Sequence, residues 1–151
     1  MRRRITAVAA AAGLLMTVGG SPGLATETTT EIIKRATETF NDDLGCLGPA
    51  SITITYRGVF HETENKRGDH YTGTLTGKFT ADPEGAGLPD YAGRFTTRFG
   101  GNFREDGRTE TFMLSITGRA TDGSGRMRFH QLVHVTKNRN GTSVEFEKTK
   151  C

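Results

Sequence analysis

The stretches ITITYRGVF (residues 52–60) and YTGTLTGKF (residues 71–79) decide the fold. In both, apolar residues or glycine alternate with threonine or a charged residue, which is the period of a β-strand rather than of a helix. The same alternation recurs in four later segments bounded by turn residues, namely 91–103, 110–120, 127–135 and 143–148. The sequence therefore predicts about six long strands after residue 46.

Two dipeptides predict where hairpins turn. Asp106-Gly107 and Asn140-Gly141 are the pairs preferred in two-residue type I′ turns. Centring the first hairpin on Asp106-Gly107 predicts a register whose inward pairs include Gly101 with Phe112 and Phe95 with Gly118. Centring the second on Asn140-Gly141 pairs Val135 with Phe146 and His134 with Glu147.

A third register is predicted by the residues flanking the loop 82–90. If Ala81 pairs with Tyr91, three further pairs set an aromatic ring over a glycine of the next strand: Phe79 with Gly93, Gly77 with Phe95, and Gly73 with Phe99. This arrangement is a known device of curved sheets. The turn and packing signals together predict an antiparallel up-and-down meander.

The fold prediction is an all-β domain over residues 46–151, with about six to eight strands forming a closed or nearly closed barrel. An even number of strands after Cys46 would bring Cys46 and Cys151, the only two cysteines, to the same end of the sheet. Two cysteines in an exported chain indicate one disulfide. A sandwich would also bring them together. For residues 26–45, and 31–40 in particular, an extra strand is favoured over an amphipathic helix.

The first 25 residues have the three zones of a secretory signal peptide. Arg2, Arg3 and Arg4 precede an apolar run at 5–18, and small residues end at Ala25. The run is shorter and less apolar than a membrane anchor needs. We expect residues 1–25 to be removed and the protein to be secreted and extracellular.

Loss of this leader changes the charge of the chain. The three arginines account for the whole formal net charge of +3, so the remainder is neutral. The basic pI therefore gives no case for a nucleic-acid partner, nor for a membrane after the leader is cleaved.

Histidine pairs are the candidates for a metal site. His130 and His134 have a spacing that chelates zinc on a helix, but four residues of strand separate them by about 13 Å, so both are expected to point outward. His61 and His70 would face each other if their hairpin turned on Asn65-Lys66. A register shifted by two, turning at Arg67, would separate them, and two solvated histidines remain the favoured interpretation.

No nucleophile with a matching base stands out, which favours a protein without catalytic activity or cofactor. The inward face carries polar groups among aliphatic and aromatic ones, which is typical of a small-molecule site. These candidate ligand-binding residues are Tyr56, Tyr71, Tyr91, Thr97 and Gln131. The alternative is a filled barrel whose tyrosines reach solvent at the rim.

Several motifs resemble a group of small secreted actinobacterial proteins. They are GVFHET (58–63), YTG (71–73), TGKF (76–79), YAGRFT (91–96), FGGN (99–102), DGS (122–124) and Phe129-His130, with Cys46 and the ending Glu147-Lys148…Cys151. The resemblance implies export from a Gram-positive cell and supplies no activity. The architecture is similar to lipocalin-like and allene-oxide-cyclase-like barrels, and such an analogy does not fix function.

The function expected from these observations is that of a secreted β-barrel binding a small apolar ligand in its lumen. The alternative is an interaction or inhibitor domain acting through the loops at Lys66-Arg67 and 84–89. A barrel isomerase or hydrolase is the third hypothesis.

Overall fold

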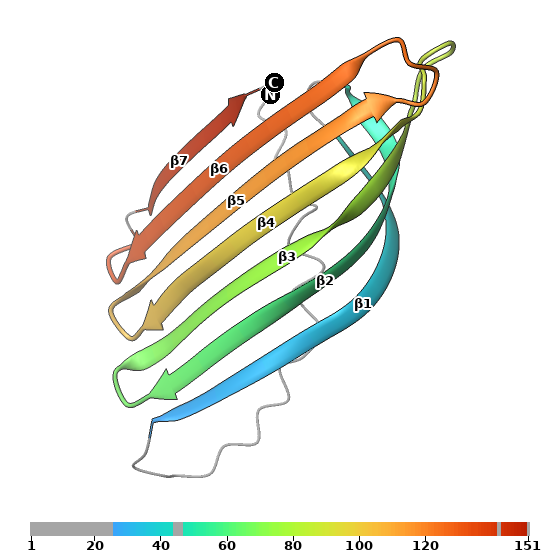
Figure 1. Ribbon diagram of the computed structural model, residues 1–151. Coiled ribbons are helices and arrows are strands. Elements are labelled where there is room, and N and C mark those ends of the chain that lie inside the picture. Colours follow the sequence, from blue (N-terminus) through green and yellow to red (C-terminus); the bar gives the residue numbers. More distant parts are fainter. Residues whose placement is uncertain (1–25, 44–46, 142, 151) are drawn as a thin grey trace.

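The computed structural model describes residues 26–43, 47–141 and 143–150. These residues form one antiparallel sheet of seven strands in sequence order, without a helix (Figure 1). The strands are β1 (Glu27–Asp43), β2 (Pro49–Asn65), β3 (Gly68–Pro83), β4 (Tyr91–Arg104), β5 (Gly107–Ala120), β6 (Arg126–Asn138) and β7 (Ser143–Lys150). The predicted all-β up-and-down meander is therefore confirmed.

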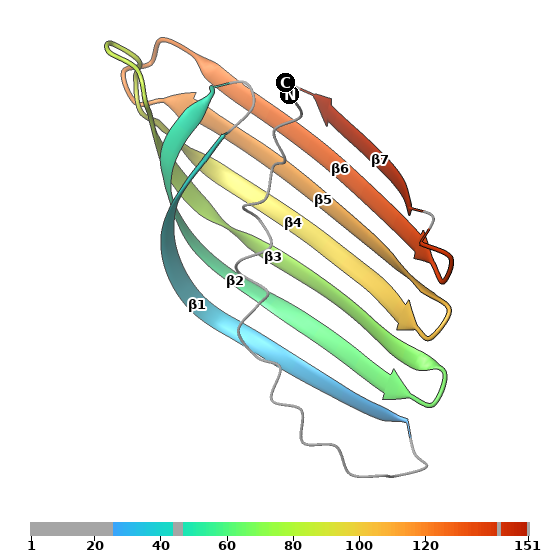
Figure 2. The same cartoon turned by 180° about the vertical axis from the view of Figure 1, so that it is seen from behind.

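The sheet is not closed by hydrogen bonds. Within the described residues, β1 pairs only with β2 and β7 only with β6, so both remain edge strands. Seen from behind, the sheet is strongly bent, and the far ends of β1 and β2 curl over one end of its inner face (Figure 2). Cys46 and Cys151 lie outside the described residues.

The register between β3 and β4 is the one predicted. Phe79 pairs with Gly93, Gly77 with Phe95, and Gly73 with Phe99. In each pair the aromatic ring occupies the space that a Cβ at the glycine would need. At Gly73 the three nearest atoms all belong to Phe99. Glycine at these positions therefore lets the aromatic rings pack against the neighbouring strand.

The β4–β5 hairpin turns one residue earlier than predicted. Glu105 and Asp106 form the turn, and Arg104 pairs with Gly107. The predicted pairs are therefore wrong by two residues: Phe95 lies opposite Ile116, and Gly101 lies opposite Glu110. A shift of two leaves every side chain on its predicted face, because side chains alternate with a period of two.

The predicted β6–β7 register is wrong by one residue, and this error changes which face each β7 side chain occupies. Lys137 pairs with Ser143 across a loop of odd length, so His134 lies opposite Phe146 and Val133 opposite Glu147. A shift of one exchanges the two faces of a strand. Phe146 is consequently 52% exposed on the outer face instead of facing inward.

Strand β1 contains a bulge that keeps its inward pattern. Ile33 pairs with Gly58 and Ala36 with Tyr56, so Lys34 and Arg35 together oppose Arg57. Both Ile33 and Ala36 pack against the core. The extra residue interrupts the period of two within 31–40. This interruption explains why the sequence pattern there was also compatible with an amphipathic helix.

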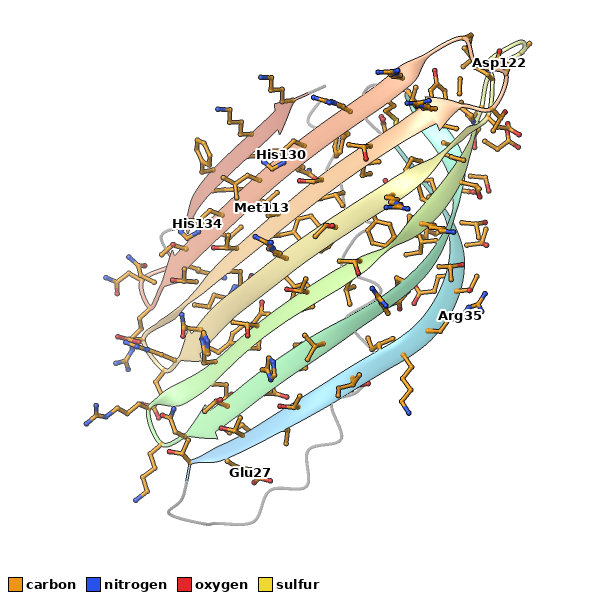
Figure 3. All side chains as sticks on the ribbon, viewed as in Figure 1. Glu27, Arg35, Met113, Asp122, His130 and His134 are labelled. Carbon is orange, nitrogen blue, oxygen red and sulfur yellow. The ribbon has the colours of Figure 1, made fainter. Side chains whose placement is uncertain are left out.

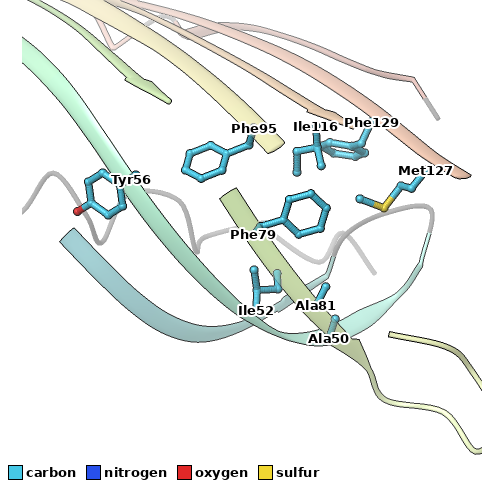
Figure 4. Packing of buried hydrophobic residues seen from close by; sticks show 9 residues of the cluster. All are labelled: Ala50, Ile52, Tyr56, Phe79, Ala81, Phe95, Ile116, Met127 and Phe129. Carbon is cyan, nitrogen blue, oxygen red and sulfur yellow. The ribbon is translucent and has the colours of Figure 1, made fainter. Parts of the chain in front are cut away.

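The core occupies one end of the concave face. Its buried apolar side chains come from β2 to β6 and face one another beneath the curled end of the sheet (Figure 4). They are Ala50, Ile52, Tyr56, Phe79, Ala81, Phe95, Ile116, Met127 and Phe129. We call this end of the concave face the closed half, and the opposite end, toward the β2–β3 and β4–β5 turns, the open half.

Candidate functional site

The open half of the concave face carries a cluster of aromatic rings. Phe60 of β2, Tyr71 of β3, and Phe99 and Phe103 of β4 alternate inward along adjacent strands, and all four are half-buried. We call these four residues the aromatic floor. No other segment of the described chain crosses it, since those residues belong to the one sheet and its connections.

The four rings form a continuous apolar surface. The Tyr71 and Phe103 ring centroids lie 5.5 Å apart with their planes at 19°. Phe60 lies 6.1 Å from both Tyr71 and Phe99, and Tyr71 lies 6.4 Å from Phe99. Offset rings at these separations attract one another beyond the area they bury. The four rings therefore hold one another in place.

One polar group lies within the aromatic floor. The Tyr71 hydroxyl donates to Glu110 Oε1 at 3.2 Å, and Arg108 Nε lies 3.6 Å from Glu110 Oε2. Burial, the negative charge of Glu110 and this hydrogen bond raise the pKa of Tyr71 to about 12, against a smaller lowering by Arg108. The hydroxyl therefore stays protonated over a wide pH range and remains a donor.

The other predicted ligand-binding residues lie deeper and do not converge with Tyr71. Tyr56 belongs to the core and donates to Glu38 Oε1 at 2.5 Å, and its pKa is raised to about 12 by burial, that hydrogen bond and the charge of Glu38. Thr97 and Gln131 are buried at 5% and 6% exposure. Gln131 Nε2 donates to Glu147 Oε1 at 3.0 Å.

Tyr91 lies apart from all of these. It pairs with Ala81 and Ala120 at the closed half, and its hydroxyl is 3.7 Å from the position of a Cβ at Gly125. The five residues are thus spread along the whole concave face, and the structure does not bring them together into one pocket.

The histidines occupy the outer, convex face. The β2–β3 hairpin turns on Lys66 and Arg67, so His61 pairs with Thr72 and His70 with Thr63. Each ring nitrogen has its own partner: His61 Nδ1 lies 2.8 Å from Thr30 Oγ1, and His70 Nδ1 lies 2.8 Å from Asn102 Oδ1. This is the shifted register, in which the two rings do not face each other.

His130 and His134 also point outward, as predicted. They lie on the same face of the sheet as Met113 of β5 (Figure 3). The Nδ1 atom of His130 lies 2.9 Å from the Ser115 hydroxyl oxygen, and that of His134 lies 2.8 Å from the Thr111 hydroxyl oxygen. Among the described residues, no three histidine, cysteine or acidic side chains are grouped in a way that could hold a metal ion.

The loops named as interaction candidates are both exposed. Lys66 and Arg67 form the two-residue β2–β3 turn. The segment 84–89 projects from the end of the sheet and exposes 53% of Leu88. The two lie at opposite ends of β3, so they do not make one surface.

Three of the four floor residues were missed from the sequence. The alternation of period two predicts that Phe60, Phe99 and Phe103 face inward, but it does not predict how deeply each side chain is buried. The available signal was the glycine opposite Phe60 and Phe99: Gly73 lies between them and leaves room for both rings.

Comparison of the chain with protein-family models, with curated proteins and with solved structures finds no match. Across the described residues, no helix has the length and apolar character needed to cross a bilayer.

Proposed function

We propose that this is a secreted, non-enzymatic binding protein that holds a small apolar ligand against the aromatic floor. The observation that carries the proposal is the half-buried state of Phe60, Tyr71, Phe99 and Phe103 on a face that no other described segment covers. Exposed apolar area of this kind costs free energy in water, and a ligand would remove it.

The ligand implied by this surface is flat or elongated and largely apolar, with one hydrogen-bonding group. Tyr71 and Glu110 supply the matching polar contact at the floor. Tyr56 and Gln131 are each only 6% exposed, unlike the half-buried Tyr71, and they bond to Glu38 of β1 and Glu147 of β7. Their contribution is therefore to hold these edge strands to the sheet. The proposed ligand-binding set is therefore narrower than the one expected from the sequence.

Barrel closure and the disulfide belong to the same proposal. Antiparallel order places Leu47, before β2, at the same end of the sheet as Lys150, the last residue of β7. A Cys46–Cys151 bridge would draw the two edges of the sheet together and narrow the concave side into a nearly closed barrel around the ligand.

Titration with a neutral lipophilic dye tests the proposal. N-phenyl-1-naphthylamine is suitable because it has no charge to respond to the basic residues of the chain. We expect saturable binding with one site per chain, weakened about tenfold or more by Phe99→Ala, since the ring supplies central contact area.

Phe146→Ala is the matched control. It removes the same side chain from the outer face, where Phe146 is 52% exposed, and should leave dye affinity unchanged. Far-UV circular dichroism and thermal unfolding show whether each variant folds. Failure of the folded wild-type protein to bind the dye, or equal loss in both variants, would overturn the proposal and favour the loop-based alternative.

A further inference from the structure

The two faces of the sheet carry opposite charge although the chain without its leader is neutral. The concave positions of β2 to β6 hold four acids, Glu62, Glu64, Asp69 and Glu110, against two bases, Arg108 and Lys137, so their net charge is negative. The convex positions of the same strands include Arg57, Lys78, Arg94, Arg98, Arg119 and Arg128. Among the described convex positions of β2 to β6, Asp82 at the end of β3 is the one carboxylate.

Cations on the convex face lie directly beside one another. Lys78 pairs with Arg94, and Arg119 with Arg126. Arg94 continues through Thr117 to Arg128, so one cross-strand row holds three cations. Like charges directly opposite each other destabilise a sheet, and within the described residues none of these side chains forms a salt bridge. Among the described residues, the row is therefore a concentration of positive charge with no salt-bridge partner.

A hollow of about 460 Å³, open to solvent, lies over this row. Lys78 and Arg94 line it together with the hydroxyl-bearing Thr53, Thr55 and Thr80, and the remaining lining residues are Phe79, Ala92 and Gly93. Cations with neighbouring hydroxyls bind oxyanions through charge-assisted hydrogen bonds. The hollow therefore has both the shape and the chemistry to hold an anionic group.

We propose that the convex face binds an anionic polysaccharide, with one carboxylate or sulfate group seated between Lys78 and Arg94. Adjacent strands are about 4.8 Å apart, so a polymer lying across β3 to β6 meets several cations in succession. The interleaved threonines suit sugar hydroxyls, and the predicted export places the protein where such polymers occur.

Other polyanions fit this face less well. Single-stranded nucleic acid is bound through aromatic side chains on which bases stack, and the convex positions of β2 to β6 hold no Phe or Tyr in the described chain. Anionic membranes are bound by basic surfaces that also carry an apolar anchor. The hollow beside Lys78 and Arg94 is otherwise lined by threonines, Ala92, Gly93 and Phe79, and Phe79 is only 3% exposed, so its ring is not available as an anchor.

Surface plasmon resonance on immobilised heparin, with neutral dextran as the blank, tests this proposal. We expect salt-sensitive binding to heparin and none to dextran. The double variant Lys78→Gln/Arg94→Gln should weaken binding about tenfold or more, because two charge-assisted contacts are lost. Its thermal stability should be equal or higher, since a like-charge pair is removed.

Lys66→Gln/Arg67→Gln is the matched control, since it removes the same two residue types from the β2–β3 turn. It should bind heparin within about twofold of wild type, as expected for charges distant from the site. Equal losses in both double variants, or no heparin binding by the wild type, would overturn the proposal. Equal affinity for duplex DNA or phosphatidylglycerol vesicles, with the same dependence on Lys78 and Arg94, would assign the face to that partner instead.

Discussion

Single residues set how closely neighbouring strands and rings can approach. A Cβ at Gly73 would overlap the ring of Phe99, so only glycine lets that ring lie flat over β3. Gly68 has a different requirement: its φ of +130° lies in a region that side-chain-bearing residues rarely adopt, and it directly follows the Lys66-Arg67 turn. Glycine is therefore required at position 73 by the close approach of the ring and at position 68 by the backbone conformation.

Gly73→Ala should destabilise the protein by about 1–3 kcal/mol, because the added methyl group displaces the Phe99 ring. Gly125→Ala is the control, since the nearest atom to its Cβ is the Tyr91 hydroxyl at 3.7 Å, and it should be neutral or slightly stabilising. Urea denaturation measures both. Recovery of stability in Gly73→Ala/Phe99→Leu would confirm the cause, and an unaltered Gly73→Ala midpoint would contradict it.

Two of the three tyrosines should ionise late in an alkaline titration. Burial and carboxylate neighbours raise the pKa values of Tyr56 and Tyr71 to about 12, whereas an unfolded chain ionises its tyrosines near pH 10. The folded state thus holds these protons more tightly than the unfolded state, so the associated stability is complete below about pH 10 and falls as pH rises toward 12.

Ultraviolet absorbance of tyrosinate follows this titration, with Tyr56→Phe and Tyr71→Phe identifying the two groups. Each variant should lose one of the late transitions. A titration in which all three tyrosines of the wild type ionise together near pH 10 would contradict the buried hydrogen bonds to Glu38 and Glu110.

Among the elements, β1 contains a bulge at the point where this edge strand bends toward the core. Bulges increase the twist of a strand and bend it, and here the bend follows Lys34 and Arg35 and precedes the half of β1 that packs Ala36 and Phe40 against the core. The outer face of the same hairpin is tied by threonine pairs, with Thr37 and Thr55 hydroxyl oxygens 3.1 Å apart and those of Thr39 and Thr53 2.9 Å apart.

Deletion of Arg35 should keep the inward pattern of β1 but remove the bend. We expect a loss of about 1–3 kcal/mol in the free energy of unfolding, as the far end of β1 leaves the core. Hydrogen exchange should show reduced protection in 36–43 and 50–54 with β5 and β6 little changed. Arg35→Ala keeps the bulge and is the control. Equal unfolding free energies and exchange patterns in the deletion and the substitution would contradict a role of the bulge in bending β1.

The sequence predicted the faces of β2 to β6 and the β3–β4 register, because period-two alternation and glycine–aromatic pairing are local signals. It failed where the position or the length of a turn sets the register, and the β4–β5 hairpin turns on Glu105 and Asp106 instead of Asp106 and Gly107. Asn140-Gly141 predicts a two-residue turn, but the loop between the paired residues Lys137 and Ser143 has odd length, which exchanges the two faces of β7. The candidate site was only partly foreseen, since Tyr71 was named but the depth of Phe60, Phe99 and Phe103 depends on how far the sheet curls.

At the scale of the whole molecule, the sheet separates an apolar, acidic concave face from a hydroxylated, basic convex face. This separation is invisible in the net charge, which led the sequence analysis to set aside a polyanionic partner. The concave closed half provides the core, the open half presents the aromatic floor, and the convex row at Lys78 and Arg94 faces solvent independently of both.

A Cys46–Cys151 bridge should stabilise this open sheet strongly. In the chain-entropy model a loop of about 100 residues contributes roughly 4–5 kcal/mol, so Cys46→Ser/Cys151→Ser should lower the free energy of unfolding by a similar amount. Denaturant unfolding of the oxidised protein and of the double variant measures the difference. Detection of two free thiols in protein from an oxidising compartment would contradict the bridge.

The most direct test of ligand binding at the aromatic floor is amide chemical-shift mapping with N-phenyl-1-naphthylamine. We expect the shifts to concentrate around Phe60, Gly73, Phe99 and Gly101, where the floor crosses β2 to β4, while Thr53, Lys78 and Arg94 change little. Shifts confined to the convex face or the loops, or no shifts at saturating dye, would contradict the claim that the concave face is the binding site.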